Sequence, residues 1–197
     1  MTSRLVVMVS GNGSNLQAII DAQASGRLPV EISGVVSNVE SAFALKRATD
    51  AGIPTTVLSH KGRDRAEYDK ELAYIVSSIG ADLVVLAGWN RLLSGHFVSH
   101  HTTINLHPAQ PGTFPGLHAI RRAYEAWKLG KISSGGVMVH YVPDEGVDDG
   151  PVIDWTAVPF MSDDTLEDFE QRVHAVEHTL LVDSINTALD RLPPKGA

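Results

Sequence analysis

The sequence predicts an α/β fold: a doubly wound, mostly parallel sheet in a single domain spanning residues 1–197. Short apolar runs alternate with amphipathic stretches through the first half, a pattern typical of parallel strands joined by crossover helices. The run Asp82–Ala87 (DLVVLA) is apolar almost throughout, as expected of a strand buried on both faces of a sheet. No internal repeat or linker-like stretch divides the chain, and its length fits one domain.

The first half is expected to hold four strands with helices between them. The strands cover Leu5–Val9, Val30–Val36, Pro54–Leu58 and Asp82–Ala87. The helices cover Ser14–Ala24, Ser41–Ala51 and Asp64–Ile79. In the last helix apolar residues recur at helical spacing, and Gly80 follows it as a typical stop signal.

The second half has a different pattern. A strand at Thr103–Leu106 leads into a Pro/Gly-rich loop, Pro108–Gly116, and then into a helix over Leu117–Leu129. Two strands, Val137–Val142 and Val152–Val158, flank an acidic loop, Pro143–Gly150. Asp164–Leu192 is expected to form a closing helix or pair of helices before a polar tail, Pro193–Ala197.

Composition and charge exclude several classes of function. The chain has no cysteine, which excludes disulfide scaffolds, thiolate zinc sites, iron–sulfur clusters and cysteine nucleophiles. A formal net charge of -7 argues against nonspecific binding to nucleic acid, although backbone N–H groups can still bind a small phosphate. No apolar run approaches the roughly 20 residues of a membrane span, and the N-terminus lacks a signal peptide. We therefore expect a soluble, cytoplasmic protein that binds neither nucleic acid nor membrane.

The segment Ser10–Asn15 (SGNGSN), called the glycine loop below, lies between the first predicted strand and helix, where open α/β sheets place their ligands. Leu16 stands where the dinucleotide fingerprint needs a third glycine, and the lysine of a Walker loop is missing. A tight glycine turn at a helix N-terminus suits a terminal phosphate monoester. A plain strand-to-helix turn with a helix cap is the alternative interpretation.

Asn105 and His107 are two residues apart on a predicted strand, so their side chains point to the same face. A histidine and a primary amide directed at one spot can combine acid–base catalysis with stabilisation of a negative oxygen. A purely structural histidine is the alternative.

The acidic loop is either a solvated turn or the source of one carboxylate that pairs with a histidine elsewhere. Gly88–Leu93, after another strand, either forms a slot for a heteroaromatic ring or begins a packed helix.

Two other motifs resemble metal sites. His174–His178 (HAVEH) matches the inverted zinc-protease pattern, but nothing else in the sequence supplies a third ligand. The acidic loop fails the calcium-loop pattern, because Gly146 stands at position 3 and Trp155 at position 12. We expect no metal.

Four motifs together resemble those of the glycinamide ribonucleotide formyltransferases, a folate-dependent family of purine synthesis. They are Ser10–Ile19 (SGNGSNLQAI), Leu83–Leu93 (LVVLAGWNRLL), Ile104–Gly116 (INLHPAQPGTFPG) and Val139–Pro151 (VHYVPDEGVDDGP), in the family's order and at its spacing. The resemblance covers essentially the whole chain. It implies a Rossmann-like formyltransferase fold in which the part near residues 1–100 binds phosphate and the part near 101–197 completes the folate and catalytic site.

The resemblance also assigns roles to residues. It implies a catalytic trio of Asn105, His107 and Asp148. Gly13, Ser14 and Asn15 are implied contacts of the ribonucleotide phosphate, and Glu177 is an implied contact of its ribose. The implied folate contacts are Arg65, Asn90, Arg91, Leu92, Leu93, Asn105, Val142 and Asp144.

Some positions depart from the family pattern. Ala109–Gly112 (AQPG) replaces the usual Ser-Leu-Leu-Pro, Asn90 stands where methionine is common, and Met138 stands where threonine or serine is frequent. Pro143 and the longer acidic loop resemble one branch of the family only. No departure removes a catalytic group, but together they bear on the shape of the folate pocket.

The implied reaction is formyl transfer from 10-formyltetrahydrofolate, a co-substrate, to the amine of 5-phosphoribosylglycinamide. A protonated His107 and the Asn105 amide would stabilise the negative oxygen, and Asp148 would raise the pKa of His107. The substrates are small molecules, no metal is needed, and the protein is expected to be a monomer or homodimer.

Three other functions compete with this one. A formyltetrahydrofolate hydrolase would use the same trio on water, but usually carries an extra N-terminal domain and has no need of the glycine loop. A methionyl-tRNA formyltransferase should have a further C-terminal domain and a basic face. A non-catalytic phosphosugar-binding module would leave Asn105, His107 and Asp148 without a purpose.

Overall fold

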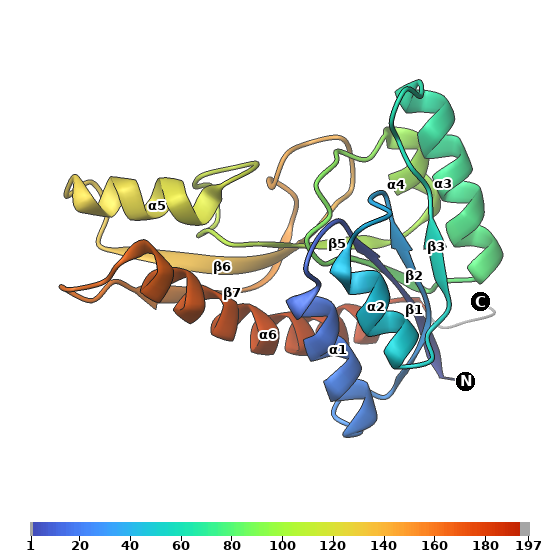
Figure 1. Ribbon diagram of the computed structural model, residues 1–197, viewed down its shortest axis with the longest axis horizontal. Helices are drawn as coiled ribbons and strands as arrows, with labels where there is room; N and C mark the ends of the chain where they lie inside the picture. The colour runs from blue at the N-terminus through green and yellow to red at the C-terminus, as the bar shows by residue number, and fades with distance from the viewer. Residues whose placement is uncertain (1, 194–197) are drawn as a thin grey trace.

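The computed structural model describes residues 2–193, which form one seven-stranded sheet flanked by helices (Figure 1). The strand order is β3-β2-β1-β4-β5-β6-β7. The first five strands in this order run parallel, and β6 runs antiparallel to both of its neighbours. The predicted α/β fold with a doubly wound, mostly parallel sheet is confirmed.

The elements follow the predicted order with one addition, the short helix between β4 and β5. The strands are β1 (Ser3–Val9), β2 (Val30–Ser37), β3 (Thr55–Val57), β4 (Leu83–Leu86), β5 (Thr103–His107), β6 (Ser134–Tyr141) and β7 (Val152–Pro159). The helices are α1 (Ser14–Ala24), α2 (Phe43–Asp50), α3 (Arg65–Ile79), α4 (Gly95–His100), α5 (Ala119–Lys128) and α6 (Leu166–Asp190). The closing segment is thus one helix, and its start is fixed by reciprocal hydrogen bonds between Thr165 and Asp168.

Strand β1 explains why an unbroken apolar run marks the centre of the sheet. Leu5, Val7 and Val9 point into a core that includes residues of α1 and α6. Val6 and Met8 point the opposite way, into a second core with residues of α3 and α4. All five side chains are fully buried, so the part of the strand from Leu5 to Val9 leaves no position for a polar residue.

The strands β6 and β7 extend beyond the parallel part of the sheet, with α5 on one side and α6 on the other (Figure 1). Strand β6 begins at Ser134, three residues before the predicted Val137. The sequence did not predict the first residues of this strand, because they include Gly135 and Gly136 and glycine weakens a strand interior. Both lie against side chains: a Cβ on Gly135 would come within 2.5 Å of Phe169, and one on Gly136 within 2.6 Å of Gln110.

The order of β1 and β4 creates a switch point at the middle of the sheet, where the loops after these two strands meet. The Ser10 N–H donates to the Gly88 carbonyl at 3.1 Å, and the Asn90 N–H donates to Ser10 Oγ at 3.1 Å. The glycine loop and the Gly88–Leu93 segment are therefore directly joined. Within residues 2–193, no helix has the length and apolar character needed to cross a membrane.

Candidate active site

The carboxyl end of β5 brings together three side chains from distant parts of the chain. Asn105 and His107 come from β5 itself, and Asp148 comes from the loop between β6 and β7. Asp148 Oδ2 lies 3.2 Å from His107 Nδ1, and Asp148 Oδ1 accepts a 2.9 Å hydrogen bond from Asn105 Nδ2. The acidic loop therefore does supply one carboxylate that pairs with a histidine.

Asp148 is held tightly by the backbone around it. Its φ of 53° lies in the left-handed region, which is unusual for a residue other than glycine. The Gly116 N–H donates to its Oδ2 at 2.7 Å. Burial acts to raise the pKa of Asp148, but the contact with His140, the hydrogen bond from the Gly116 N–H and the neighbouring His107 ring outweigh it and lower that pKa. The carboxyl group is therefore ionised at neutral pH.

His107 is almost completely buried, with 4% of its surface exposed. Its Nδ1 faces Asp148, and its Nε2 lies 3.1 Å from the Phe114 carbonyl oxygen. Burial lowers the pKa of His107 below its ordinary value, although the Asp148 charge and the Phe114 carbonyl act in the opposite direction. Asp148 therefore acts on this pKa in the expected direction, but the pKa of His107 does not rise above its ordinary value, because the loss of hydration outweighs the ion pair.

His140 joins this group, and the sequence reasoning missed it. It stands directly opposite Asn105 in the antiparallel register of β5 and β6. Its Nδ1 lies 2.8 Å from the Tyr141 carbonyl, which can only accept a hydrogen bond, so Nδ1 carries a proton. Its Nε2 lies 3.2 Å from Asn105 Nδ2 and 3.4 Å from Asp148 Oδ1. His140 stands within the motif VHYVPDEGVDDGP, but only the strand register reveals that it reaches the trio.

A cavity of about 490 Å³ opens beside the trio. Asn105, His107 and Asp148 form part of its wall, and all the expected folate contacts except Arg65 also line it. Leu117 and His118 add lining that sequence reasoning did not include. A cavity of this size with apolar walls and a few convergent polar groups is typical of small-molecule sites.

Arg65 does not line the cavity but is hydrogen-bonded to segments that surround it. Its guanidinium donates to the Leu93 carbonyl at 3.1 Å and to Glu145 at 2.8 Å. Glu145 in turn accepts a 2.8 Å hydrogen bond from the Gly95 N–H. Arg65 thus ties the acidic loop to the segment that follows β4.

Within the glycine loop, Gly13 is the N-cap residue of α1 and has a left-handed φ of 77°. No side chain caps the N–H groups at the start of this helix. Helix α2 packs directly against the loop: Ala44 N–H donates to the Gly11 carbonyl at 3.1 Å, and a Cβ on Gly13 would come within 2.5 Å of Ala44 Cβ. Arg47, also on α2, donates to the Asn12 carbonyl at 2.9 Å and to its side-chain oxygen at 3.0 Å.

Glu177 brings α6 to the same loop. It is 4% exposed, and its Oε2 accepts a 3.0 Å hydrogen bond from Asn15 Nδ2. His174 Nδ1 lies 2.9 Å from the same oxygen, and this hydrogen bond raises the pKa of His174 against the opposing effect of burial. The Asn15 side-chain oxygen is buried without a hydrogen-bond partner, so this end of the site holds an unused acceptor.

Comparison with known proteins settles the family. A formyl transferase family model matches residues 3–185. The chain belongs to the formyl transferase family. The phosphoribosylglycinamide formyltransferase of Schizosaccharomyces pombe is 45% identical over 201 residues, with 94% of this chain and 97% of that protein covered. The Escherichia coli protein of the same name is 39% identical, with 98% and 97% covered.

A solved structure agrees. Glycinamide ribonucleotide transformylase 1 from Symbiobacterium toebii superimposes with a TM-score of 0.90 at 37% identity, covering 99% of this chain and 92% of that one. The resemblance inferred from the four motifs is confirmed.

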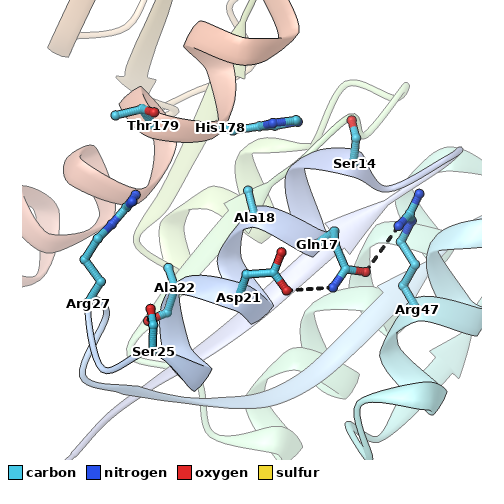
Figure 2. A pocket seen from close by; sticks show the side chains of 10 residues that line it. All are labelled: Ser14, Gln17, Ala18, Asp21, Ala22, Ser25, Arg27, Arg47, His178 and Thr179. Carbon is cyan, nitrogen blue, oxygen red and sulfur yellow. Dashed lines mark hydrogen bonds between the residues drawn. The ribbon is translucent and has the colours of Figure 1, made fainter.

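In this formyl transferase a groove of about 620 Å³ runs beside α1, next to the glycine loop (Figure 2). Figure 2 shows Arg47, Gln17 and Asp21 joined by hydrogen bonds along one wall, with His178 across the groove. His178 thus belongs to the groove, whereas His174 and Glu177 bond to each other. Among residues 2–193, no three His, Asp or Glu side chains gather as metal ligands.

Proposed function

We propose that the chain transfers the formyl group of 10-formyltetrahydrofolate to the primary amine of 5-phosphoribosylglycinamide. The observation that carries this proposal is the meeting of buried Asn105, His107 and Asp148 at the wall of the 490 Å³ cavity. Relatives at 39% and 45% identity that align over nearly their full length bear the name of this activity.

The cavity fits the folate co-substrate. Leu86, Leu93 and Val142 offer apolar surface for a flat heteroaromatic ring, and the Asn90–Leu93 segment adds backbone and side-chain polar groups. The folate contacts in this proposal are Asn90, Arg91, Leu92, Leu93, Asn105, Val142 and Asp144, which line the cavity. Arg65, which is hydrogen-bonded to the Leu93 carbonyl, would contact a part of the folate that extends outside the cavity. The co-substrate supplies a formyl carbon activated by its bond to nitrogen.

The ribonucleotide binds at the glycine loop. Backbone N–H groups of Gly13, Ser14 and Asn15 hold the phosphate, aided by the positive end of the α1 dipole. Glu177, already hydrogen-bonded to Asn15, accepts hydrogen bonds from the ribose hydroxyls. The N-terminal part of the chain, near residues 1–100, thus supplies the phosphate site, and the part near 101–197 completes the folate and catalytic site.

The chemistry needs one proton to move. The amine nitrogen forms a bond to the formyl carbon, the bond from that carbon to the folate nitrogen breaks, and a proton passes from the amine to the folate nitrogen. His107, neutral at neutral pH because burial lowers its pKa, accepts the proton and returns it. Asp148 and the Phe114 carbonyl stabilise the imidazolium while it exists.

Asn105 stabilises the negative charge that develops on the formyl oxygen. Its amide nitrogen faces two acceptors, Asp148 Oδ1 and His140 Nε2. One amide hydrogen must therefore turn from these partners toward the formyl oxygen during the reaction. The longer of the two contacts, 3.2 Å to His140, is the one most easily exchanged.

The remaining parts of the proposal concern setting. The substrates are small molecules, the protein is cytoplasmic, and it acts as a monomer or homodimer without binding nucleic acid or membrane. The net charge of -7 supports the absence of nucleic-acid binding.

A formyl-transfer assay with and without the ribonucleotide tests the proposal. The folate product is followed by its absorbance, with His107→Ala as the inactive control. We expect product only when the ribonucleotide is present. Equal product formation in its absence would show that water is the acceptor and that the chain is a hydrolase.

A further inference from the structure

Arg122, on α5, makes a cluster of contacts to a short turn at the active site. Its Nη2 donates to the carbonyl oxygens of Phe114 at 2.7 Å and Pro115 at 2.6 Å, and lies 3.4 Å from that of Gly116. Its guanidinium carbon also lies 6.0 Å from the centre of the Phe114 ring. One half-buried arginine therefore holds three successive backbone carbonyls.

The same turn contacts both members of the His107–Asp148 pair. The Phe114 carbonyl lies 3.1 Å from His107 Nε2, and the Gly116 N–H donates to Asp148 Oδ2 at 2.7 Å. Phe114 has a φ of 48°, a left-handed conformation that a residue with a Cβ adopts only when its surroundings enforce it. The hydrogen bonds from Arg122 supply that constraint.

We propose that Arg122 is a positioning residue: it holds the turn Phe114–Gly116 against His107 and Asp148, and shares the Phe114 carbonyl with His107. This inference rests on the proposed roles of His107 and Asp148 in formyl transfer. Arg122 donates no hydrogen bond to the side chain of His107 or Asp148. It acts on His107 through the Phe114 carbonyl oxygen, which both residues contact.

The shared carbonyl has a consequence for the charge of His107. The titratable and charged groups around its ring are Asp148 from the acidic loop, His140 from β6 and Arg122 from α5. Asp148 favours the imidazolium, whereas the positive charge of Arg122 disfavours it and lowers the pKa of His107. Arg122 also occupies the Phe114 oxygen that would otherwise serve the imidazolium alone. Both effects keep His107 ready to accept a proton.

Helix α5 offers a matched control. Arg121 precedes Arg122 on the same helix, carries the same charge and has an exposed side chain. The hydrogen bonds to the Phe114–Gly116 turn come from Arg122 and none of them from Arg121. Removing its charge therefore separates a general effect of net charge from the specific effect of Arg122.

The test compares Arg122→Gln, Arg122→Lys and Arg121→Gln with the parent enzyme. The readouts are the pH dependence of kcat and the NMR titration of His107 in labelled protein, with its signal assigned by His107→Asn. We expect Arg122→Gln to move both midpoints to higher pH by about half a unit. Arg122→Lys should keep the parent midpoints and lower kcat, since the charge stays and the fork of donors is lost. Arg121→Gln should change neither.

Several results would overturn the inference. They are parent midpoints in Arg122→Gln, an equal shift in Arg121→Gln, or a shift in Arg122→Lys as large as in Arg122→Gln. If Arg122→Gln does not fold, Arg122→Lys and the control still decide the matter through the NMR titration. That titration does not require activity, so failure of this inference is distinct from failure of the proposed function, which an active His107→Ala variant would reveal.

Discussion

The proposed phosphate site at the glycine loop and the proposed catalytic site lie on the same sheet but are built in different ways. The former, residues 10–15, is a continuous segment whose backbone N–H groups would do the binding, with α2 and α6 packed against it. The latter joins side chains from β5, β6 and the acidic loop. A binding site made of backbone N–H groups depends on how closely the neighbouring helices approach the loop. A site made of side chains depends on which residues the surrounding elements carry.

Backbone strain follows the same division. Among residues 2–193, the non-glycine residues with positive φ are Phe114, His118 and Asp148; His118 and Asp148 line the 490 Å³ cavity, and the Phe114 carbonyl contacts His107 beside it. In the glycine loop the left-handed position is filled by Gly13, which adopts it at little cost. Phe114 is held by a hydrogen bond from Arg122, and Asp148 by hydrogen bonds from the Asn105 side chain and the Gly116 N–H.

The largest expected effect concerns the side-chain site. His107→Ala removes the proton acceptor and should lower kcat by about 10²–10⁴, while the KM of the ribonucleotide changes little. His100→Ala, an exposed histidine on α4, is the control and should retain parent kcat. Steady-state kinetics decide the outcome, and near-normal kcat in His107→Ala would contradict the division of labour.

The next effect concerns the backbone site. Gly13→Ala places a Cβ within 2.5 Å of Ala44 and forces a left-handed φ on alanine, so kcat/KM for the ribonucleotide should fall by about 10–100-fold. Folate KM should stay near the parent value. Gly26→Ala is the matched control, because Gly26 has a φ of 76° but no neighbour within 4 Å of its added Cβ. Equal kinetic losses in the two variants would show that the backbone strain of an alanine with positive φ explains the result, and that the position of Gly13 in the glycine loop does not matter.

A smaller effect is expected where α2 supports the loop. Arg47→Ala removes the hydrogen bonds to Asn12 and Gln17 and should raise the KM of the ribonucleotide by roughly 3–10-fold, with kcat unchanged. Lys46→Ala is the control, since Lys46 pairs with Asp50 on the surface. A fall in kcat with no change in that KM would place Arg47 in the catalytic site instead.

The smallest effect is a shift along the pH axis. Because burial lowers the pKa of His107, the acidic limb of kcat should have its midpoint below about 6.5, with activity lost as the pH falls through it. Asp148→Asn removes the charge that favours the imidazolium, so the midpoint should move lower still. A midpoint above 6.5 in the parent enzyme would contradict the proton-acceptor role.

Most of the fold could be predicted from the sequence, because β1, β4 and the long helices carry clear periodicity. Helix α4 was missed: it has six residues and buries only Phe97, so no periodic pattern marks it. The start of β6 was hidden by glycines whose packing against Phe169 and Gln110 is a tertiary effect. Local sequence does not carry such information.

The site divides in the same way. The glycine loop and the pairing of β5 with the acidic loop followed from motifs, so Asn105, His107 and Asp148 were found together. His140 was missed because its approach depends on the antiparallel register of β5 and β6. The direction of the His107 pKa shift was wrong because it depends on a depth of burial that no spacing of residues reveals.

The most direct test of the central claim, that His107 and Asp148 act as one unit, is a double-mutant cycle in kcat for His107→Ala and Asp148→Asn. The two groups share a 3.2 Å contact inside a buried site, so the loss of either should disable the same proton transfer. We predict that the double variant is little worse than the worse single variant. Fully additive losses in log kcat would contradict the account and leave Asp148 as a residue of the folate loop only.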